Sequence, residues 1–238
     1  MLVKKKSICL LILGLVMTLC SCSGTTDVGN KITTSNTTLP PENAVTQEQT
    51  PASTPEPTPT PEVEIPETIT YTGSGDDVIT IGAFEDLRVF HITGNAADRH
   101  FAVKGYNEKG NYTELLVNTT DPYEGVTFDP KMETTTLEIT ATGEWSVDVV
   151  SILNMPLISA GETLSGDSDS IILLRDYGAT ATIKGNADER HFAVKSYGAK
   201  RDHLLVNTTE EYEGTVMLKD EPVILEVDAE SPWTITLN

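Results

Sequence analysis

The chain contains one sequence unit twice, and this repeat limits the architectures that it can adopt. The run RHFAVKGY at Arg99–Tyr106 returns as RHFAVKSY at Arg190–Tyr197. Ser74–Asn95 aligns with Ser165–Asn186 without a gap, and the match continues through LLVNTT and YEG to a single tryptophan in each copy. A period near ninety residues is too long for a solenoid repeat and is typical of a whole small domain. We therefore expect two homologous domains in tandem.

Apolar and polar residues alternate along both copies, as in half-buried strands. In Thr136–Ala141 every second residue is apolar, and Ile224–Ala229 keeps the same phase. No segment shows a sustained helical period. We predict an all-β chain of two tandem antiparallel β-sandwich domains over residues 65–151 and 155–238, of about seven or eight strands each, with a small barrel as the alternative. The predicted cores contain Phe101, Val103, Leu137, Ile139 and Trp145 in the first copy and Phe192, Val194, Leu225, Val227 and Trp233 in the second.

Glycine and asparagine mark the expected turns between these strands. Gly110-Asn111 predicts the tip of a hairpin in the first copy. The pairs Gly94-Asn95 and Gly185-Asn186 predict turns with positive φ.

The N-terminus has the pattern of an export signal. Three lysines at Lys4–Lys6 precede the apolar run Ile8–Leu19, which is too short to span a bilayer and suits the apolar core of a signal peptide. Leu19 and Ser21 occupy the positions before Cys22 that resemble the bacterial lipobox. This resemblance implies a signal peptide over 1–21, a lipid on Cys22 and attachment to the membrane through that lipid. The alternative is an ordinary secretory signal with incidental cysteines.

Removal of this leader would change both the thiols and the charge. Cys9 and Cys20 would leave with it, and lipidation of Cys22 would leave no thiol for a disulfide, a metal site or a nucleophile. The loss of three lysines takes the net charge from −20 to −23. So acidic a surface would be repelled by nucleic acid, so no nucleic-acid partner is expected.

Residues 22–64 have the composition of a linker. Thr, Pro, Ser and Glu dominate, and neither a strand period nor a helix period persists. Such a segment cannot bury enough apolar surface to offset the entropy of ordering, so we expect a disordered linker between the lipid anchor and the first domain.

The strings SGDDVITI, FAV, LLVNTT, YEG and LEITATGEWSV together resemble an all-β module of secreted and surface proteins of Gram-positive bacteria. The resemblance covers most of Gly73–Val149 and, more loosely, Leu164–Leu237. It implies a cell-surface location on the extracytoplasmic side of the membrane. It implies no activity.

Catalytic motifs are missing from the sequence. It contains no GxSxG, HExxH or CxxC motif and no P-loop. A repeated acid–Arg–His run ends at His100 and His191, and we interpret it as a solvated strand entrance because one histidine per copy is too few for a zinc site. The chain is therefore not expected to be an enzyme or to hold a cofactor or metal.

Two further features have a structural and a functional interpretation. The acidic turns Asp76-Asp77 and Asp167–Asp169 suit either turn capping, which we favour, or structural calcium. Trp145 and Trp233 suit either sugar stacking or core packing, and their strand phase favours the core. Tyr123 and Tyr212 are expected at strand ends or corners.

The strand phase predicts a repeated outer face with polar and aromatic side chains. Besides the polar and aromatic residues of this face, we expect Ala102 in the first copy and Ala193 in the second to point outward. We predict a lipid-anchored binding or adhesion module for an envelope polymer, a glycan or a partner protein, with weak sites repeated in tandem. The alternatives are a structural or spacer lipoprotein and an envelope-acting hydrolase. The candidate ligand face consists of His100, Lys104 and Tyr106 in the first copy and His191, Lys195 and Tyr197 in the second.

Overall fold

A computed structural model describes residues 64–238 of the chain. The residues from Ile65 to Asn238 belong to one compact unit. The predicted signal peptide, Cys22 and, apart from Glu64, the predicted linker lie outside the described residues.

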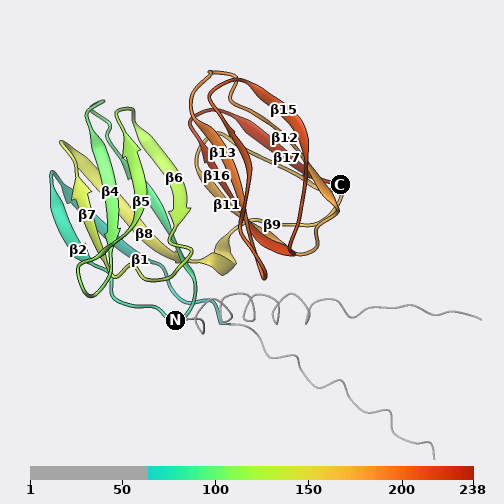
Figure 1. Cartoon of the computed structure of the whole chain (residues 1–238). Coiled ribbons are helices and arrows are strands. Elements are labelled where there is room, and N and C mark those ends of the chain that lie inside the picture. Colours follow the sequence, from blue (N-terminus) through green and yellow to red (C-terminus); the bar gives the residue numbers. More distant parts are fainter. Residues whose placement is uncertain (1–63) are drawn as a thin grey trace, which may run out of the picture. The chain divides into compact units, whose positions relative to one another are not determined.

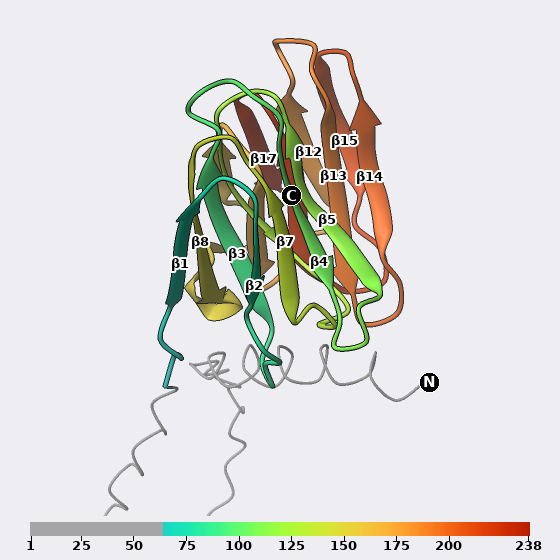
Figure 2. The same cartoon turned by 90° about the vertical axis from the view of Figure 1, so that its left-hand side faces the viewer.

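The first half of this unit, module 1, is an antiparallel sandwich of two four-stranded sheets. One sheet has the order β1-β8-β3-β6 and the other the order β2-β7-β4-β5, which Figure 2 shows across the near face. The sheets are open at both edges, so the module is a sandwich and not a barrel. Its strands are β1 (Ile69–Ser74), β2 (Asp77–Thr80), β3 (Arg88–Gly94), β4 (Phe101–Tyr106), β5 (Tyr112–Thr119), β6 (Tyr123–Phe128), β7 (Thr136–Thr140) and β8 (Glu144–Ser151).

The second half, module 2, repeats this arrangement after a short 3₁₀ turn, η1 (Ile152–Asn154). Its sheets have the orders β10-β17-β12-β15 and β14-β13-β16-β11-β9 (Figure 1). β9 pairs with β11 in parallel, whereas the other pairs are antiparallel. The all-β prediction of two tandem sandwiches is confirmed. The strands are β9 (Leu157–Ile158), β10 (Thr163–Gly166), β11 (Ser170–Leu174), β12 (Thr180–Gly185), β13 (Phe192–Gly198), β14 (His203–Thr208), β15 (Tyr212–Met217), β16 (Pro222–Ala229) and β17 (Trp233–Leu237).

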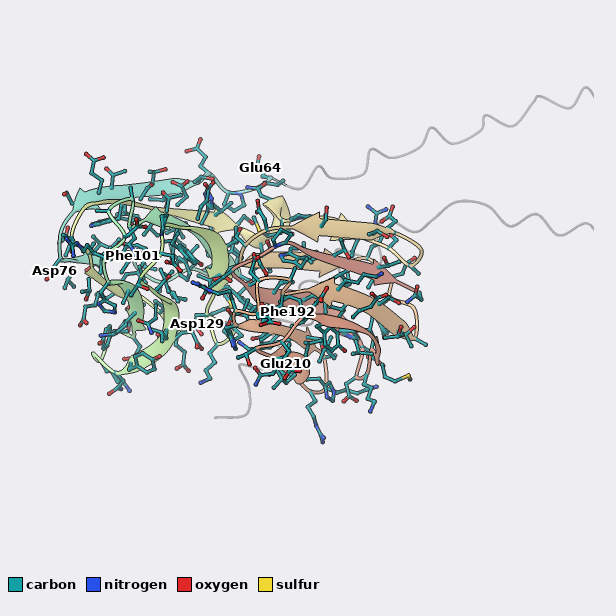
Figure 3. All side chains as sticks on the ribbon, turned by 90° about the horizontal axis from the view of Figure 1, so that it is seen from above. Glu64, Asp76, Phe101, Asp129, Phe192 and Glu210 are labelled. Atoms are coloured by element: carbon teal, nitrogen blue, oxygen red, sulfur yellow. The ribbon has the colours of Figure 1, made fainter. Side chains whose placement is uncertain are left out.

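Each module has its own apolar core between its two sheets. All ten residues predicted for the cores are buried, and Figure 3 shows Phe101 and Phe192 inside separate sandwiches. Each tryptophan lies over a glycine of the neighbouring strand: an added Cβ at Gly73 would be 2.2 Å from the Trp145 ring, and one at Gly166 would be 2.5 Å from the Trp233 ring. The tryptophans are therefore core residues that require glycine opposite them.

Strand pairing corrects the expected gapless alignment of the two copies. Gly73 lies opposite Trp145 and Gly166 lies opposite Trp233, so the first strands correspond with an offset of 93 residues. β3 and β12 correspond with an offset of 91, because Gly94 and Gly185 also face these tryptophans. Module 2 is thus two residues shorter in the loop that precedes β12. The alignment was wrong because the repeated Ser-Gly-Asp letters allowed two registers.

The turns with positive φ predicted at Gly94-Asn95 and Gly185-Asn186 are confirmed. The positive φ falls on Asn95 (63°) and Asn186 (64°), and not on the preceding glycines. Each asparagine is buried, and its Oδ1 accepts the backbone N–H of Arg99 or Arg190, at 2.8 Å in both modules. Gly94 and Gly185 are required for another reason, since an added Cβ would lie 2.6 or 2.8 Å from the ring of Phe101 or Phe192.

Candidate functional site

The two modules pack against each other through an apolar cluster. In β11 and β16, Ile172 and Leu225 belong to the core of module 2, whereas their neighbours Ile171 and Ile224 belong to this second cluster. Successive strand residues point to opposite faces, so the second cluster lies on the outer face of that sheet. From module 1 the cluster takes Leu87, Val89 and Phe128 as buried members, and from the η1 turn between the modules it takes Ile152.

An aromatic contact lies at the edge of this interface. The rings of Phe128 and Tyr197 are 5.0 Å apart and nearly perpendicular, a favourable edge-to-face arrangement. The hydroxyl group of Tyr197 donates a hydrogen bond to Glu226 at 2.5 Å. Burial, followed by the neighbouring Glu226 carboxylate, raises the pKa of Tyr197. Tyr197 is therefore an interface residue and is not available on an open ligand face.

Beside this apolar contact the modules leave a cleft of about 740 Å³. This volume lies in the range of ordinary ligand sites. Module 1 contributes β5, the turn after it and most of β6. Module 2 contributes Lys195 of β13, the end of β16 and the turns before β11 and β13.

The cleft is strongly acidic. Its cationic side chains are engaged: Arg190 bonds to Asp121 of module 1 and to Glu230 at 2.6 Å, and Lys195 bonds to Glu226 at 3.1 Å. Burial raises the pKa of Glu114, as do the Glu226 and Asp129 carboxylates. Carboxylates outnumber Lys and Arg nine to two in the lining, with His191 in addition: Glu114, Asp121, Glu124, Asp167, Asp169, Asp188, Glu226, Asp228 and Glu230.

Asp169 connects the two modules at the base of the cleft. Its carboxylate accepts the O–H of Tyr123 from module 1 at 2.7 Å and the backbone N–H of Ala229 at 2.8 Å. Its carbonyl oxygen accepts the N–H of Val126 at 2.8 Å. Burial raises the pKa of Asp169 to about 6; the Asp228 carboxylate adds to this, whereas the Tyr123 hydrogen bond opposes it. The group is therefore a structural acceptor whose charge is costly.

The acidic turns act as backbone caps. Asp76 accepts the N–H of Ala141 at 3.0 Å, as Asp169 accepts that of Ala229, and Asp77 bonds to the N–H of Val78. Among residues 64–238, no group of three His, Cys, Asp or Glu side chains is arranged to hold a metal ion.

The candidate ligand face of module 1 does not reach the cleft. His100 contacts Asn118 at 3.1 Å, and Lys104 bonds to Glu138 at 3.2 Å. Tyr106 packs edge-on against Tyr112, with ring centres 6.1 Å apart. Tyr112 is 56% exposed, and no motif or repeated letter in the sequence marks it.

The candidate residues of module 2 lie in a different environment. His191 and Lys195 line the cleft, with His191 3.4 Å from Asp228, whereas Tyr197 is at the module interface. The repeated face therefore lies away from the other module in module 1, whereas in module 2 it faces the cleft and the module interface. Ala102 and Ala193, which were expected to point outward, are both buried.

One sequence signal marks the sheet of module 2 that packs against module 1. Module 2 has four consecutive apolar residues, Ile171–Leu174, and all four are buried. Such a run is typical of a strand that is buried on both faces. The structurally equivalent segment of module 1 reads VITI, and its Val78 is 64% exposed. The Asp121–Arg190 pair and the Tyr123–Asp169 bond have no comparable signal, because each joins residues far apart in the sequence.

No protein-family profile matches the chain, and neither does any curated protein. Among solved structures, the chain is similar to a regulatory subunit of a cAMP-independent protein kinase A from Trypanosoma cruzi bound to guanosine, at 11% identity and a TM-score of 0.22, over 68% of this chain and 72% of that one. It is also similar to cAMP-bound PfPKA-R (141–441), at 9% identity and a TM-score of 0.22, over 71% and 70% of the two chains. Scores this low support no inference about fold or function.

Over residues 64–238 there is no helix with the length and apolar character that a membrane span requires.

Proposed function

We propose that this protein is a lipid-anchored, non-catalytic binding protein on the extracytoplasmic side of the cell membrane, and that its ligand binds in the cleft between the two modules. The ligand is an envelope polymer, a glycan or a partner protein. The observation that carries the proposal is the cleft itself, because a duplication that acted only as a spacer would have no need of a charged space of about 740 Å³ between its halves.

Two features support a binding role over catalysis. Two carboxylates of the cleft have a raised pKa, Glu114 and Asp169; the pKa of Asp169 is raised to about 6, and both of its oxygens are occupied, by Tyr123 and by the backbone of Ala229. The cations of the cleft are held in ion pairs with Asp121, Glu230 and Glu226. A general acid or base needs a free path to its substrate, whereas fixed charges suit recognition.

The anchor is inferred from the sequence around Cys22. Leu19 and Ser21 precede that cysteine as in a lipobox, and the segment 22–64 separates it from module 1. A lipid on Cys22 would hold an acidic protein at a membrane that its charge does not favour.

The anchor is tested by replacing Cys22 with Ala and fractionating the cells. We expect the variant to be released from the membrane or to keep its signal peptide. A processed Cys22→Ala protein that stays in the membrane fraction at the wild-type level would contradict the anchor.

Binding is tested separately with a panel of cell-wall polysaccharides, peptidoglycan, glycans and basic proteins. A ligand of the cleft should be lost by the double variant Glu114→Gln, Asp228→Asn and retained by Lys104→Ala, Tyr106→Ser, which changes the open face of module 1. The reverse pattern would move the site to that open face. Binding to nothing in the panel would favour the spacer role.

A further inference from the structure

We propose that the free edge of β5 is a docking site for an extended, lysine- or arginine-rich polypeptide segment, which adds to the sheet as a new strand inside the cleft. This inference rests on the proposed function of the cleft and names the class of its ligand.

β5 is an edge strand. It is the last strand of its sheet and pairs with β4 alone among the described strands. The edge of such a strand presents N–H and C=O groups that another strand can pair with. Strand addition to an exposed edge is a common mode of peptide recognition.

This free edge of β5 faces the cleft. All six residues from Glu114 to Thr119 line it in an uninterrupted series. Side chains alternate between the two faces of a sheet, so six consecutive residues can line one space only if the strand turns its edge toward that space.

In the adjacent edge strand, β6, an unpaired backbone N–H group is satisfied by module 2. The N–H of Val126 donates to the carbonyl oxygen of Asp169 at 2.8 Å, which closes that part of the β6 edge. In the described chain β5 has no comparable backbone bond across the cleft. The space beside β5 is thus left open where the space beside β6 is filled.

The acidic lining of the cleft complements a positively charged strand. Across the cleft from β5 stands the outer face of β13 and β16, with Lys195, Glu226 and Asp228, and the surrounding turns add further carboxylates. Every second side chain of an added strand would point toward one face of the sheet. Lysine or arginine at these positions would meet carboxylates, whereas acidic residues would be repelled.

The duplication supplies an internal control. β14 is the equivalent edge strand of module 2, and LLVNTT begins at Leu115 in one copy and at Leu204 in the other. Within the described chain, the acidic cleft takes none of its lining from β14. β14 therefore offers the same edge without the carboxylates.

The test uses the full-length protein in detergent and a peptide of about ten alternating lysines and threonines, long enough to run along the eight residues of β5. Two matched peptides accompany it: one with glutamate in place of lysine, and one with every backbone nitrogen methylated. Methylation keeps the charge but removes the N–H donors. Binding is measured by calorimetry, and the sites of contact by amide hydrogen exchange.

We expect the lysine peptide to bind, the glutamate peptide to fail, and methylation to weaken binding by on the order of tenfold or more, because several backbone bonds are lost. Amides of Leu115–Thr119 should gain protection, whereas those of Leu204–Thr208 should not. The double variant Glu114→Gln, Asp228→Asn should weaken binding more than the control Glu138→Gln, Glu213→Gln, which neutralises carboxylates outside the cleft.

Each contrary result has a distinct meaning. Equal binding of the methylated peptide, or protection of both edges alike, would overturn strand addition at β5. Binding of an amine-bearing polysaccharide, but not of the peptide, in a way that the cleft variant abolishes would also overturn it while the proposed cleft function stands. If nothing binds in a manner sensitive to the cleft variant, both proposals fail.

Discussion

Asp169 should make the stability of this protein depend on pH between about pH 4 and pH 7. Its pKa is raised from 3.8 to about 6 in the folded state, first by burial. The folded state therefore holds this proton more tightly than the unfolded state. The stabilisation is complete below the unfolded pKa and is lost as the pH rises through the folded pKa.

The magnitude follows from the two pKa values. A difference from 3.8 to about 6 corresponds to about 3 kcal/mol, since one pKa unit is worth about 1.4 kcal/mol. About 2 kcal/mol of this develops between pH 7 and about pH 4, because pH 4 is still slightly above the unfolded pKa. Replacement by asparagine removes the titration and keeps the side chain's shape.

The assay is urea unfolding of wild type and Asp169→Asn at a series of pH values, followed by tryptophan fluorescence. Trp233 is a local reporter, since its indole N–H donates to the carbonyl of Ser168 at 2.9 Å. Other carboxylates titrate in both proteins, so the quantity of interest is the difference between them. It should change by about 2 kcal/mol in favour of the wild type as the pH falls from 7 to about 4.

Tyr123→Phe provides a second check, because it should shift the pH dependence that Asp169→Asn removes. The Tyr123 hydrogen bond lowers the pKa of Asp169, so its loss should raise that pKa and move the pH window upward. If wild type and Asp169→Asn keep a constant difference in stability across this range, the raised pKa of Asp169 is wrong.

Three further predictions concern packing. Trp233→Ala should cost about 3–5 kcal/mol and unfold module 2 in circular dichroism and proteolysis; an unchanged melting temperature would mean that this side chain is not in the core. Phe128→Ala, at the module interface, should cost about 3–4 kcal/mol and split thermal unfolding into two transitions, whereas a single unshifted transition would contradict the interface. Gly166→Ala places a Cβ 2.5 Å from the Trp233 ring and should cost about 1–3 kcal/mol by overpacking. Gly143→Ala, whose Cβ would meet nothing within 4 Å, is the matched control and should melt close to wild type.

The core of each module could be predicted because alternation along a strand reports which face is buried. Leu137, Ile139 and Trp145 follow that period, and all three are buried with their counterparts. The alignment of the two copies could not be predicted at their first strands. The Ser-Gly-Asp letters fit two alignments, and only the contact of each tryptophan with its glycine selects one.

The candidate site was less predictable, because its parts come together only in the folded pair. Equal letters at Lys104 and Lys195 predicted two equivalent faces, yet one is open and the other lies across the cleft from β5. The apolar residues that module 1 contributes to the module interface are also not repeated. Val89, Val126 and Phe128 of module 1 correspond to Thr180, Thr215 and Met217 of module 2. These changes leave module 2 without the apolar surface that module 1 offers to its neighbour.

The sequence by itself determined the duplication, the strand class and the inward face of each strand, since these depend on local order and on a period of two residues. Tertiary structure alone decided what lies against the outer faces. A period of two separates the faces of a strand but carries no information about what covers the second face. That depends on contacts between residues far apart in the chain, such as Tyr123 with Asp169 and Phe128 with Tyr197. The cleft exists only because those contacts fix one module beside the other.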